Sequence, residues 1–410
     1  MARTPSQPRL PLSQNATGTS VLVLTLALLA IGVVMVPSAV SSLRVVEVEH
    51  WWSRVSHRHI VFAVASAVVL MTFWRMDYHW LARTRRLPLV GVVSGVPALV
   101  LLLAAVGLGV LVLIPGVGHK VGDYARWLRV PAGGVELSVQ PSEFIKIALV
   151  VFLAAWLTHP NTQPRRLWTF VAAALVTGAC VGVIITQDFG TAAVVGLSAA
   201  VTMILAGVPW YYLGVFIPAS AGAFWLLVVN VPYRWSRFEA MMDPWGTYHT
   251  KWGLVAILSG GWWGKGLGEG TIKQGYLPER STDYIFSVWC EELGLVGGAL
   301  LLLLLAVWMF QVRRAAVRAP DRFGLALAGG VGFVVAMQSL LHIAVNLAAY
   351  VPPKGIGLPF VSAGGTSMLI LAAAVAMIVS VTSRSRTDET PLQSESPAAM
   401  IAAKPAEPAE

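Results

Sequence analysis

Residues 293–310 read LGLVGGALLLLLLAVWMF, a run of 18 residues without a charged side chain. A helix needs about 20 mostly apolar residues to cross the hydrocarbon core of a bilayer. That core holds no water to satisfy backbone N–H and C=O groups, and a helix satisfies them within one segment. The run therefore predicts a transmembrane helix, which we place at residues 285–312.

Apolar runs of similar length recur along the chain and predict an all-α polytopic membrane protein with about ten transmembrane helices. The expected spans are 19–41, 59–75, 88–115, 142–158, 167–186, 189–207, 209–231, 285–312, 323–349 and 362–383. Only short polar breaks, at Gln187-Asp188 and Gly207-Val208-Pro209, separate the fifth, sixth and seventh spans.

The composition of the 410 residues supports this class, since 56% are hydrophobic and only 12% are charged. A soluble domain carries about 25% charged residues, so this chain lacks the polar surface of a soluble globule. Intrinsic disorder requires the opposite composition. Both cysteines, Cys180 and Cys290, lie in apolar segments, which excludes a disulfide framework and a zinc-type spacing.

Basic residues in the short loops predict the orientation of the helices. Arginines cluster after the second, fourth and eighth spans, and these loops share one side if the N-terminus is cytoplasmic. They are Arg75, Arg83, Arg85, Arg86, Arg165, Arg166, Arg313, Arg314, Arg318 and Arg322. Basic residues between 44 and 58 and between 120 and 129 fall on the opposite side and reduce the difference in basic residues between the two sides. The net charge of +9 thus indicates orientation in a membrane rather than nucleic-acid binding, and an even span number places both termini inside.

The membrane domain is expected at residues 19–383, between a cytoplasmic tail at 1–18 and a disordered cytoplasmic tail at 384–410. The C-terminal tail is rich in Ser, Pro, Ala and Glu and lacks periodicity. Arg3 and Arg9 before an apolar run also suit a cleaved signal peptide, but the nine later spans favour an uncleaved first helix.

Two segments on the outside, residues 116–141 and 232–284, are longer than a simple connection between helices requires. Long loops in compact proteins are usually functional. We therefore expect the chemistry in these two segments.

The long loop contains a glycine-rich stretch, SGGWWGKGLGEG, at residues 259–270. A P-loop requires Ser or Thr after its lysine, and Gly266 occupies that position here. No strand precedes the stretch, which argues against a dinucleotide-binding turn. It suits a flexible loop that brings backbone N–H groups and Lys265 near an anion.

A dense polar cluster, KQGYLPERSTDYIF at residues 273–286, follows directly before the eighth span. Asp283 lies where a carboxylate can face a cavity at the membrane surface, but it also suits the N-cap of the following helix. Both interpretations stay open. Glu291 and Glu292 lie one to two turns further on, where acidic residues can be purely structural.

The fourth span begins with QPSEFIK at residues 140–146, in which Pro141 and Glu143 suit the first turn of a helix. Lys146 lies deeper, inside an apolar helix. Intramembrane charges are energetically costly and usually mark functional sites. Asp188, between two spans, can be interpreted as a functional residue for the same reason. An ion pair of Lys146 with Asp188 or with Glu143 is the structural alternative.

Taken in order, these segments resemble the SEDS family (shape, elongation, division and sporulation), the polytopic peptidoglycan polymerases that include FtsW, RodA and SpoVE. The resemblance covers about residues 20–383. The matching stretches are Ala125–Trp127, Gln140–Glu143 with Lys146, Gln187–Thr191, Ser259–Gly261, Gly264–Gly268, Tyr276–Glu279, Thr282–Phe286, Glu291–Gly294 and Lys354–Ser367.

Four positions depart from the usual pattern of the family: Ala125, Ser138, Ser281 and Ala363 replace Arg, a basic residue, His and Tyr. None of these departures removes the aspartate at position 283. Lys354 favours the division branch, FtsW, over the elongation branch, RodA.

The resemblance implies polymerisation of lipid II, the undecaprenyl-pyrophosphate-linked disaccharide-pentapeptide, at the outer face of the bacterial cytoplasmic membrane. Joining a sugar 4-hydroxyl to an anomeric carbon requires a base at the acceptor and stabilisation of charge on the departing pyrophosphate. Asp283 is the expected catalytic base. The expected substrate-binding residues are Arg126, Lys146, Lys265, Lys273, Glu143, Asp188, Arg237 and Glu279.

The resemblance implies a class B penicillin-binding protein and other division proteins as partners, no nucleic acid, and a location at the division septum. No all-protein metal cage is visible, and assistance by Mg²⁺ or Mn²⁺ is left open. The alternatives are a lipid II flippase, a structural component of the division machinery and a RodA-like elongation polymerase. Lys146 and Asp188 at membrane depth would suit transport, whereas the polar outside loop suits an enzyme better.

Overall fold

The computed structural model describes residues 11–41, 54–87, 91–93, 95–121, 124–132, 135–185, 188–215, 225–230, 241–349, 351–352 and 355–384. Single residues at 218, 222, 235 and 239 are also described. Most of the predicted N-terminal tail and nearly all of the C-terminal tail lie outside these ranges, as do Arg237 and Lys354.

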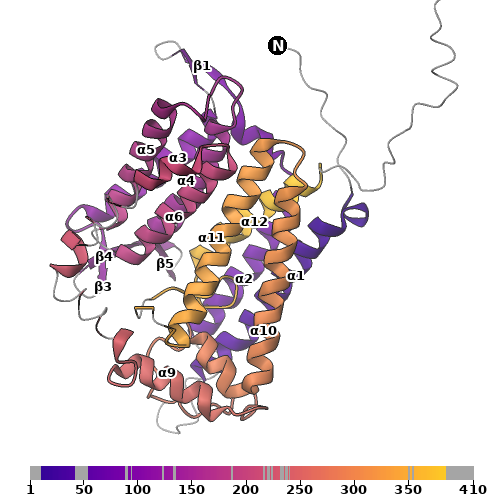
Figure 1. The fold of residues 1–410 in the computed structure, drawn as a ribbon. Coiled ribbons are helices and arrows are strands. Elements are labelled where there is room, and N and C mark those ends of the chain that lie inside the picture. The colour runs from indigo at the N-terminus through magenta and orange to yellow at the C-terminus, as the bar shows by residue number, and fades with distance from the viewer. Residues whose placement is uncertain are drawn as a thin grey trace, which may run out of the picture.

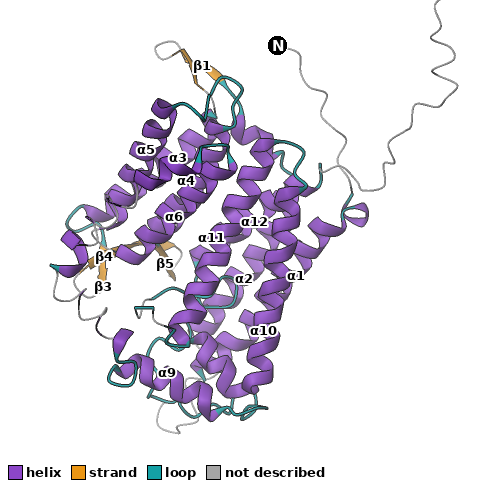
Figure 2. Cartoon of the chain, viewed as in Figure 1, coloured by secondary structure: helices purple, strands orange, loops and turns teal. Residues whose placement is uncertain are grey.

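Ten α-helices make up most of the described chain (Figure 2). They are α1 (Ala16–Val40), α2 (Arg54–Phe73), α3 (Val96–Leu113), α4 (Pro141–Leu157), α5 (Leu167–Ile185), α6 (Phe189–Leu205), α9 (Tyr248–Ser259), α10 (Ile285–Val317), α11 (Arg322–Asn346) and α12 (Thr366–Thr382). Short 3₁₀ helices occur at η1 (Leu12–Gln14), η2 (Tyr78–Ala82) and η3 (Trp210–Val215), and η4 (Trp225–Val229) is a π-helical turn.

The helices form two groups that lie side by side (Figure 1). Helices α3, α4, α5 and α6 form one group, and α1, α2, α10, α11 and α12 form the other. Helix α11 packs against both α4 and α6 and so joins the groups. Gly330 on α11 leaves no room for a Cβ beside Val150 and Thr202, and such small residues allow helices to approach closely in membranes.

Nine of the ten predicted spans coincide with α-helices, and five of the described helices are long and apolar enough to cross a membrane. These five are α1, α3, α5, α10 and α11. The chain is therefore a multi-pass membrane protein. The predicted span at 209–231 is described only in parts, as η3 and η4, and the rest of it lies outside the described residues.

The third predicted span, at 88–115, began too early. Strands β1 (Arg85–Leu87) and β2 (Gly91–Val93) form an antiparallel hairpin there, and α3 begins only at Val96. Gly95 precedes the helix with φ 65°, a left-handed conformation that glycine adopts readily and that interrupts the right-handed helix at this point.

The segment 116–141, for which we predicted no secondary structure, contains an antiparallel sheet. Strands β3 (His119–Val121), β4 (Tyr124–Ala132) and β5 (Val135–Val139) follow the order β3-β4-β5. Strand β5 leads through Gln140 directly into α4. The sheet and α9 lie at one end of the molecule, and β1 lies at the other end (Figure 1). The described parts of the two segments that we predicted to lie outside are therefore at the same end.

Helix α10 is kinked at Gly294, which has φ 69° and ψ −170°. The glycine-rich loop uses the backbone groups near this kink. Leu295 N donates to Gly261 O at 2.9 Å, and Lys265 N donates to Glu291 O at 3.1 Å. A Cβ at residue 294 would collide with the loop backbone. The kink and the loop therefore form one hydrogen-bonded unit.

Candidate functional site

A cavity of about 360 Å³ opens among the N-terminal ends of α4, α6 and α10 and the loop before α12. Six of the nine predicted site residues line it: Arg126, Glu143, Lys146, Asp188, Glu279 and Asp283. These residues come from β4, α4, the start of α6 and the segment before α10. The fold thus gathers residues that lie up to 157 positions apart in sequence, since 283 − 126 = 157.

Lys146 lies in the floor of the cavity and is only 3% exposed. Its ammonium donates to both carboxylate oxygens of Glu143 at 2.9 Å and to Oε1 of Gln338 at 2.8 Å. Ser367 Oγ donates to Glu143 Oε2 at 2.7 Å. The predicted alternative of a Lys146–Glu143 ion pair is therefore present, and the same pair also lines the cavity.

Asp188 serves as the N-cap of α6, because its carboxylate accepts hydrogen bonds from the backbone N–H and the hydroxyl of Thr191. These bonds measure 3.0 and 2.8 Å. A cap satisfies one of the N–H groups that a helix leaves unpaired at its start. Asp188 nevertheless faces the cavity, so it orients the end of α6 and contributes negative charge to the wall.

Asp283 lies immediately before α10, whose N-cap position is occupied by the next residue, Tyr284. The backbone at Asp283 is held from two sides. Its N–H donates to Glu279 O at 2.9 Å, and its carbonyl accepts from Asn346 Nδ2 at 2.9 Å. A Cβ on Gly355 would lie 2.9 Å from Asp283 Oδ2. A glycine at position 355 therefore leaves room for this carboxylate at the cavity wall.

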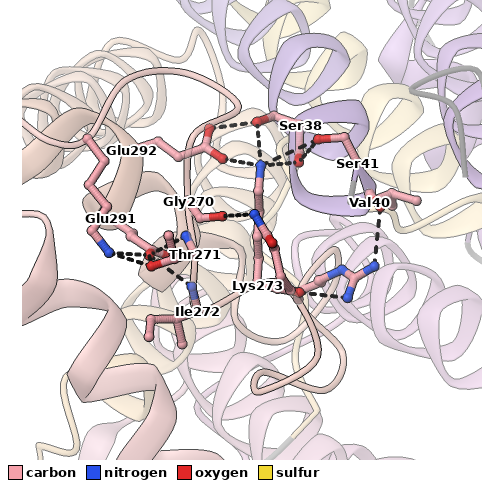
Figure 3. Close-up of polar contacts among 12 residues, drawn as sticks. Ser38, Val40, Ser41, Gly270, Thr271, Ile272, Lys273, Glu291 and Glu292 are labelled. Atoms are coloured by element: carbon pink, nitrogen blue, oxygen red, sulfur yellow. Dashed lines mark hydrogen bonds and ion pairs between the residues drawn. The ribbon is translucent and has the colours of Figure 1, made fainter. Parts of the chain in front are cut away.

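Lys265 and Lys273 do not line the cavity, contrary to our expectation for substrate-binding residues. Lys265 Nζ pairs with Glu291 at 2.7 Å, and Lys273 Nζ pairs with Glu292 at 2.6 Å. Figure 3 shows both carboxylates within networks of hydrogen bonds. The physical reason is the kink of α10, which places two adjacent carboxylates beneath the glycine-rich loop. The third predicted residue, Arg237, lies outside the described residues.

The FtsW/RodA/SpoVE family model, described as a cell cycle protein, matches residues 19–387. This chain belongs to the FtsW/RodA/SpoVE family. It is 34% identical to a probable peptidoglycan glycosyltransferase FtsW of Halomonas elongata, over 90% of this chain and 92% of that protein. It is 33% identical to the stage V sporulation protein E of Bacillus subtilis, over 89% and 96% of the two chains. The family predicted from the motifs is thereby confirmed, and further relatives at 35% and 36% identity also carry the name FtsW.

Solved structures share the fold of this family member. A chain of a peptidoglycan synthase complex, studied for its coordination of polymerization and crosslinking, superposes with a TM-score of 0.69 at 25% identity. The match covers 90% of this chain and 98% of that one. The rod shape determining protein RodA of Thermus thermophilus gives 0.61 at 23% identity, over 90% and 97%.

Helix α11 of this FtsW/RodA/SpoVE protein has a polar face that was not predicted from the sequence. Gln338, His342 and Asn346 are buried and recur every four residues, which places them on one helix face. Gln338 bonds Lys146, His342 Nδ1 lies 2.6 Å from Ile356 O, and Asn346 holds Asp283. Their spacing within an apolar span was a usable signal, because polar groups at membrane depth usually face the bundle interior.

A second cavity of about 250 Å³ adjoins the first and shares Trp127, Thr282, Ala363 and Gly364 with it. Arg58 of α2 lines the second cavity and donates to Ser138 Oγ at 2.7 Å. Two chambers with basic side chains thus flank the loop that carries Asp283. Within the described ranges, no cluster of three or more His, Cys, Asp or Glu side chains could hold a metal ion.

Proposed function

We propose that the protein is a peptidoglycan glycosyltransferase that polymerises lipid II at the outer face of the bacterial cytoplasmic membrane for septal wall synthesis. The observation that carries the proposal is the cavity that combines the carboxylate of Asp283 with Arg126 and Lys146 inside a membrane bundle. The names of the FtsW relatives, each a probable peptidoglycan glycosyltransferase, support the same activity.

In the proposed reaction, the 4-hydroxyl oxygen of one sugar attacks the anomeric carbon of the other substrate. The bond from that carbon to the pyrophosphate breaks, and the hydroxyl proton passes to Asp283. A free Asp has a pKa of about 3.9, so it accepts a proton efficiently only as the new C–O bond forms. Positive side chains near the departing pyrophosphate stabilise the charge that develops there.

Arg126 is the better ligand for the pyrophosphate. A lysine ammonium has three donors, and those of Lys146 already serve Glu143 and Gln338. An arginine guanidinium presents a planar fork that binds phosphate oxygens bidentately. Lys146 then acts through its charge across the cavity. Glu143 and Gln338 hold it in place.

The two adjoining chambers support a reaction with two lipid-linked substrates. Both substrates carry a pyrophosphate, and only the donor releases it. Thr282, next to Asp283, borders both chambers, and each chamber has an arginine, Arg126 or Arg58. One chamber would take the donor and the other would take the acceptor, with Asp283 between them.

A lipid II flippase is the second candidate, and the ion pair of Lys146 within α4 favours it, because transport pathways contain charges at membrane depth. A class B penicillin-binding protein is the proposed partner under either function. The structurally similar synthase complex, which coordinates polymerization and crosslinking, supports such a partner. The proposal also includes cytoplasmic termini, a location at the septum and the FtsW rather than the RodA branch.

The test is polymerisation of purified lipid II by the wild type and by Asp283→Ala, each with and without a class B penicillin-binding protein. Asp243→Asn serves as the control, because this carboxylate is exposed and lies outside the cavity lining. We expect long glycan strands from the wild type and the control and none from Asp283→Ala. Equal product from all three would remove Asp283 from the mechanism. Product from none, together with transfer of labelled lipid II across vesicles by the wild type, would favour the flippase.

A further inference from the structure

Lys273 is fully buried, and its ammonium joins three separate parts of the chain (Figure 3). It donates to Glu292 Oε1 on α10 at 2.6 Å and to Ser38 O near the end of α1 at 2.7 Å. Ser38 Oγ in turn donates to Glu292 Oε2 at 2.6 Å. The end of α1, the first part of α10 and the outside loop therefore meet at one buried ion pair.

Arg280 extends this network toward the cavity. Its guanidinium donates to the carbonyl of Lys273 at 2.7 Å and to the carbonyl of Val40 at 3.2 Å. Arg280 stands three residues before Asp283, so the arginine ties the loop that carries the carboxylate to the end of α1. Arg280 is half-buried and is not among the residues that line either cavity.

The turn from Glu279 to Asp283, which includes Arg280, needs such support because its first residue is strained. Glu279 has φ 50°, a left-handed conformation that is uncommon for residues other than glycine. Its carbonyl accepts hydrogen bonds from the backbone N–H groups of Thr282, Asp283 and Tyr284. Strained backbone persists only where the surrounding structure determines it, and it occurs frequently at functional sites.

We propose that the Lys273–Glu292 pair, acting through Arg280, is a positioning device that sets the carboxylate of Asp283 against the cavity. The inference rests on the proposed function of Asp283. On the other side, Asn346 and the start of α10 already hold the same residue. The buried pair supplies the second support, which connects the loop to α1. Loss of this support leaves the basic side chains of the cavity in place but misplaces the base.

A positioning role predicts a specific kinetic signature. Arg280→Gln should lower kcat for lipid II polymerisation at least 10-fold and change KM less than 2-fold, because the proposed pyrophosphate-binding side chains Arg126 and Lys146 stay in place while Asp283 shifts. Arg280→Lys keeps one of the two contacts with backbone carbonyls and should regain part of the lost kcat. A residue that only stabilises the fold would lower the melting temperature without lowering the kcat of the folded protein.

A test of the buried Lys273–Glu292 pair itself requires a double variant. Removal of one partner alone leaves an unpaired buried charge, and such proteins often fail to fold. Lys273→Met with Glu292→Leu removes both charges while keeping similar volume. We expect a folded protein with kcat reduced at least 10-fold and KM nearly unchanged.

Asn15→Ala is the control for a simple loss of stability. Asn15 makes a buried hydrogen bond to Thr382 Oγ1 at 2.9 Å at the opposite end of α1. This variant should lower the melting temperature and leave kcat unchanged. Full kcat in Arg280→Gln and in the double variant, with Asp283→Ala inactive, would overturn the positioning role and leave the proposed function standing. A wild type without polymerase activity would instead overturn the proposed function.

Discussion

In the described part of the chain, two Lys–Glu pairs have both side chains buried, and these pairs look alike in isolation but occupy different surroundings. Lys146 and Glu143 lie 2.9 Å apart, with side chains 3% and 9% exposed. Lys273 and Glu292 lie 2.6 Å apart, and neither is exposed. Only the first pair lines the cavity that also contains Asp283. The second pair is enclosed between α1, α10 and the outside loop.

Burial and pairing therefore do not by themselves identify a functional site. Taking two charges out of water costs several kcal/mol per ion, and a well-packed apolar pair of similar volume is often as stable. The presence of each buried charged pair therefore needs an explanation other than stability. The cavity explains Lys146 and Glu143, and the positioning of the loop explains Lys273 and Glu292.

Among the variants that test this comparison, the largest effect is expected from neutralising the cavity pair. Lys146→Met should reduce polymerisation by about 100-fold or more, because it removes a positive charge near the departing pyrophosphate. Adding Glu143→Leu removes the unpaired carboxylate and should restore the melting temperature but not the activity. Glycan synthesis and thermal unfolding measured on the same preparations check both expectations. Recovery of activity in the double variant would show that Lys146 and Glu143 have only a structural role.

A smaller effect is expected from Arg126→Lys, which tests whether a basic residue of the cavity contributes more to substrate binding than a basic residue outside it. Lysine keeps the charge but loses the bidentate fork, so KM for lipid II should rise about 10-fold, which corresponds to about 1.4 kcal/mol. Arg129→Lys is the matched control on the same strand, three residues away and exposed. Steady-state kinetics of both variants provide the measurement. Equal KM values for the two would remove Arg126 from substrate binding.

The smallest effect concerns a third, half-exposed ionic cluster at the start of α11. His79 Nε2 lies 2.6 Å from Asp321 Oδ2, and His79 Nδ1 lies 3.1 Å from Asp77 Oδ1. Burial opposes the charged imidazole, but hydrogen bonds and charges of Asp321 and Asp77 outweigh it and raise the pKa of His79 above 6.5. Burial likewise opposes the charged carboxylates, yet their bonded partners lower the pKa of Asp321 and of Asp77 below 3.8.

The sign of the pH dependence follows from these shifts. The contribution of His79 is complete below its unfolded pKa near 6.5 and is lost as the pH rises through its folded pKa. The contributions of the two carboxylates are lost only in acid, as the pH falls through their lowered folded pKa values. Raising the pH from about 6 to about 8.5 should lower the melting temperature by on the order of 1 °C, and less in His79→Gln. Thermal unfolding of both proteins across this range is the measurement, and identical pH profiles would contradict it.

The sequence predicted most of the helices and six of the residues that line the cavity, for different reasons. Apolar runs locate helices because a bilayer imposes a minimum length, and nine of the predicted spans coincide with α-helices. The motif residues identified Asp283, Arg126 and Lys146, which the fold brings to one cavity. The hairpin at 85–93 and the sheet β3-β4-β5 were missed, because short strands outside the membrane have no long periodic pattern.

The ion-pair partners of the two loop lysines, Lys265 and Lys273, could not be predicted from the sequence. Lys265 and Glu291 are 26 positions apart, and Lys273 and Glu292 are 19 apart. Nothing in their spacing shows that a kink at Gly294 directs both carboxylates toward the loop. The polar face of Gln338, His342 and Asn346 was visible as a four-residue repeat, but its partners were not.

What the sequence by itself determined is the membrane class, the approximate limits of nine of the ten predicted spans, and the motif residues that belong to the family. Local composition is sufficient for these, because the bilayer acts on each segment separately. The tertiary structure alone decided which charges face a cavity and which are enclosed with a partner. That decision depends on contacts between segments far apart in the chain, such as Ser38 with Glu292 and Lys146 with Gln338, and local sequence does not encode the distance between them.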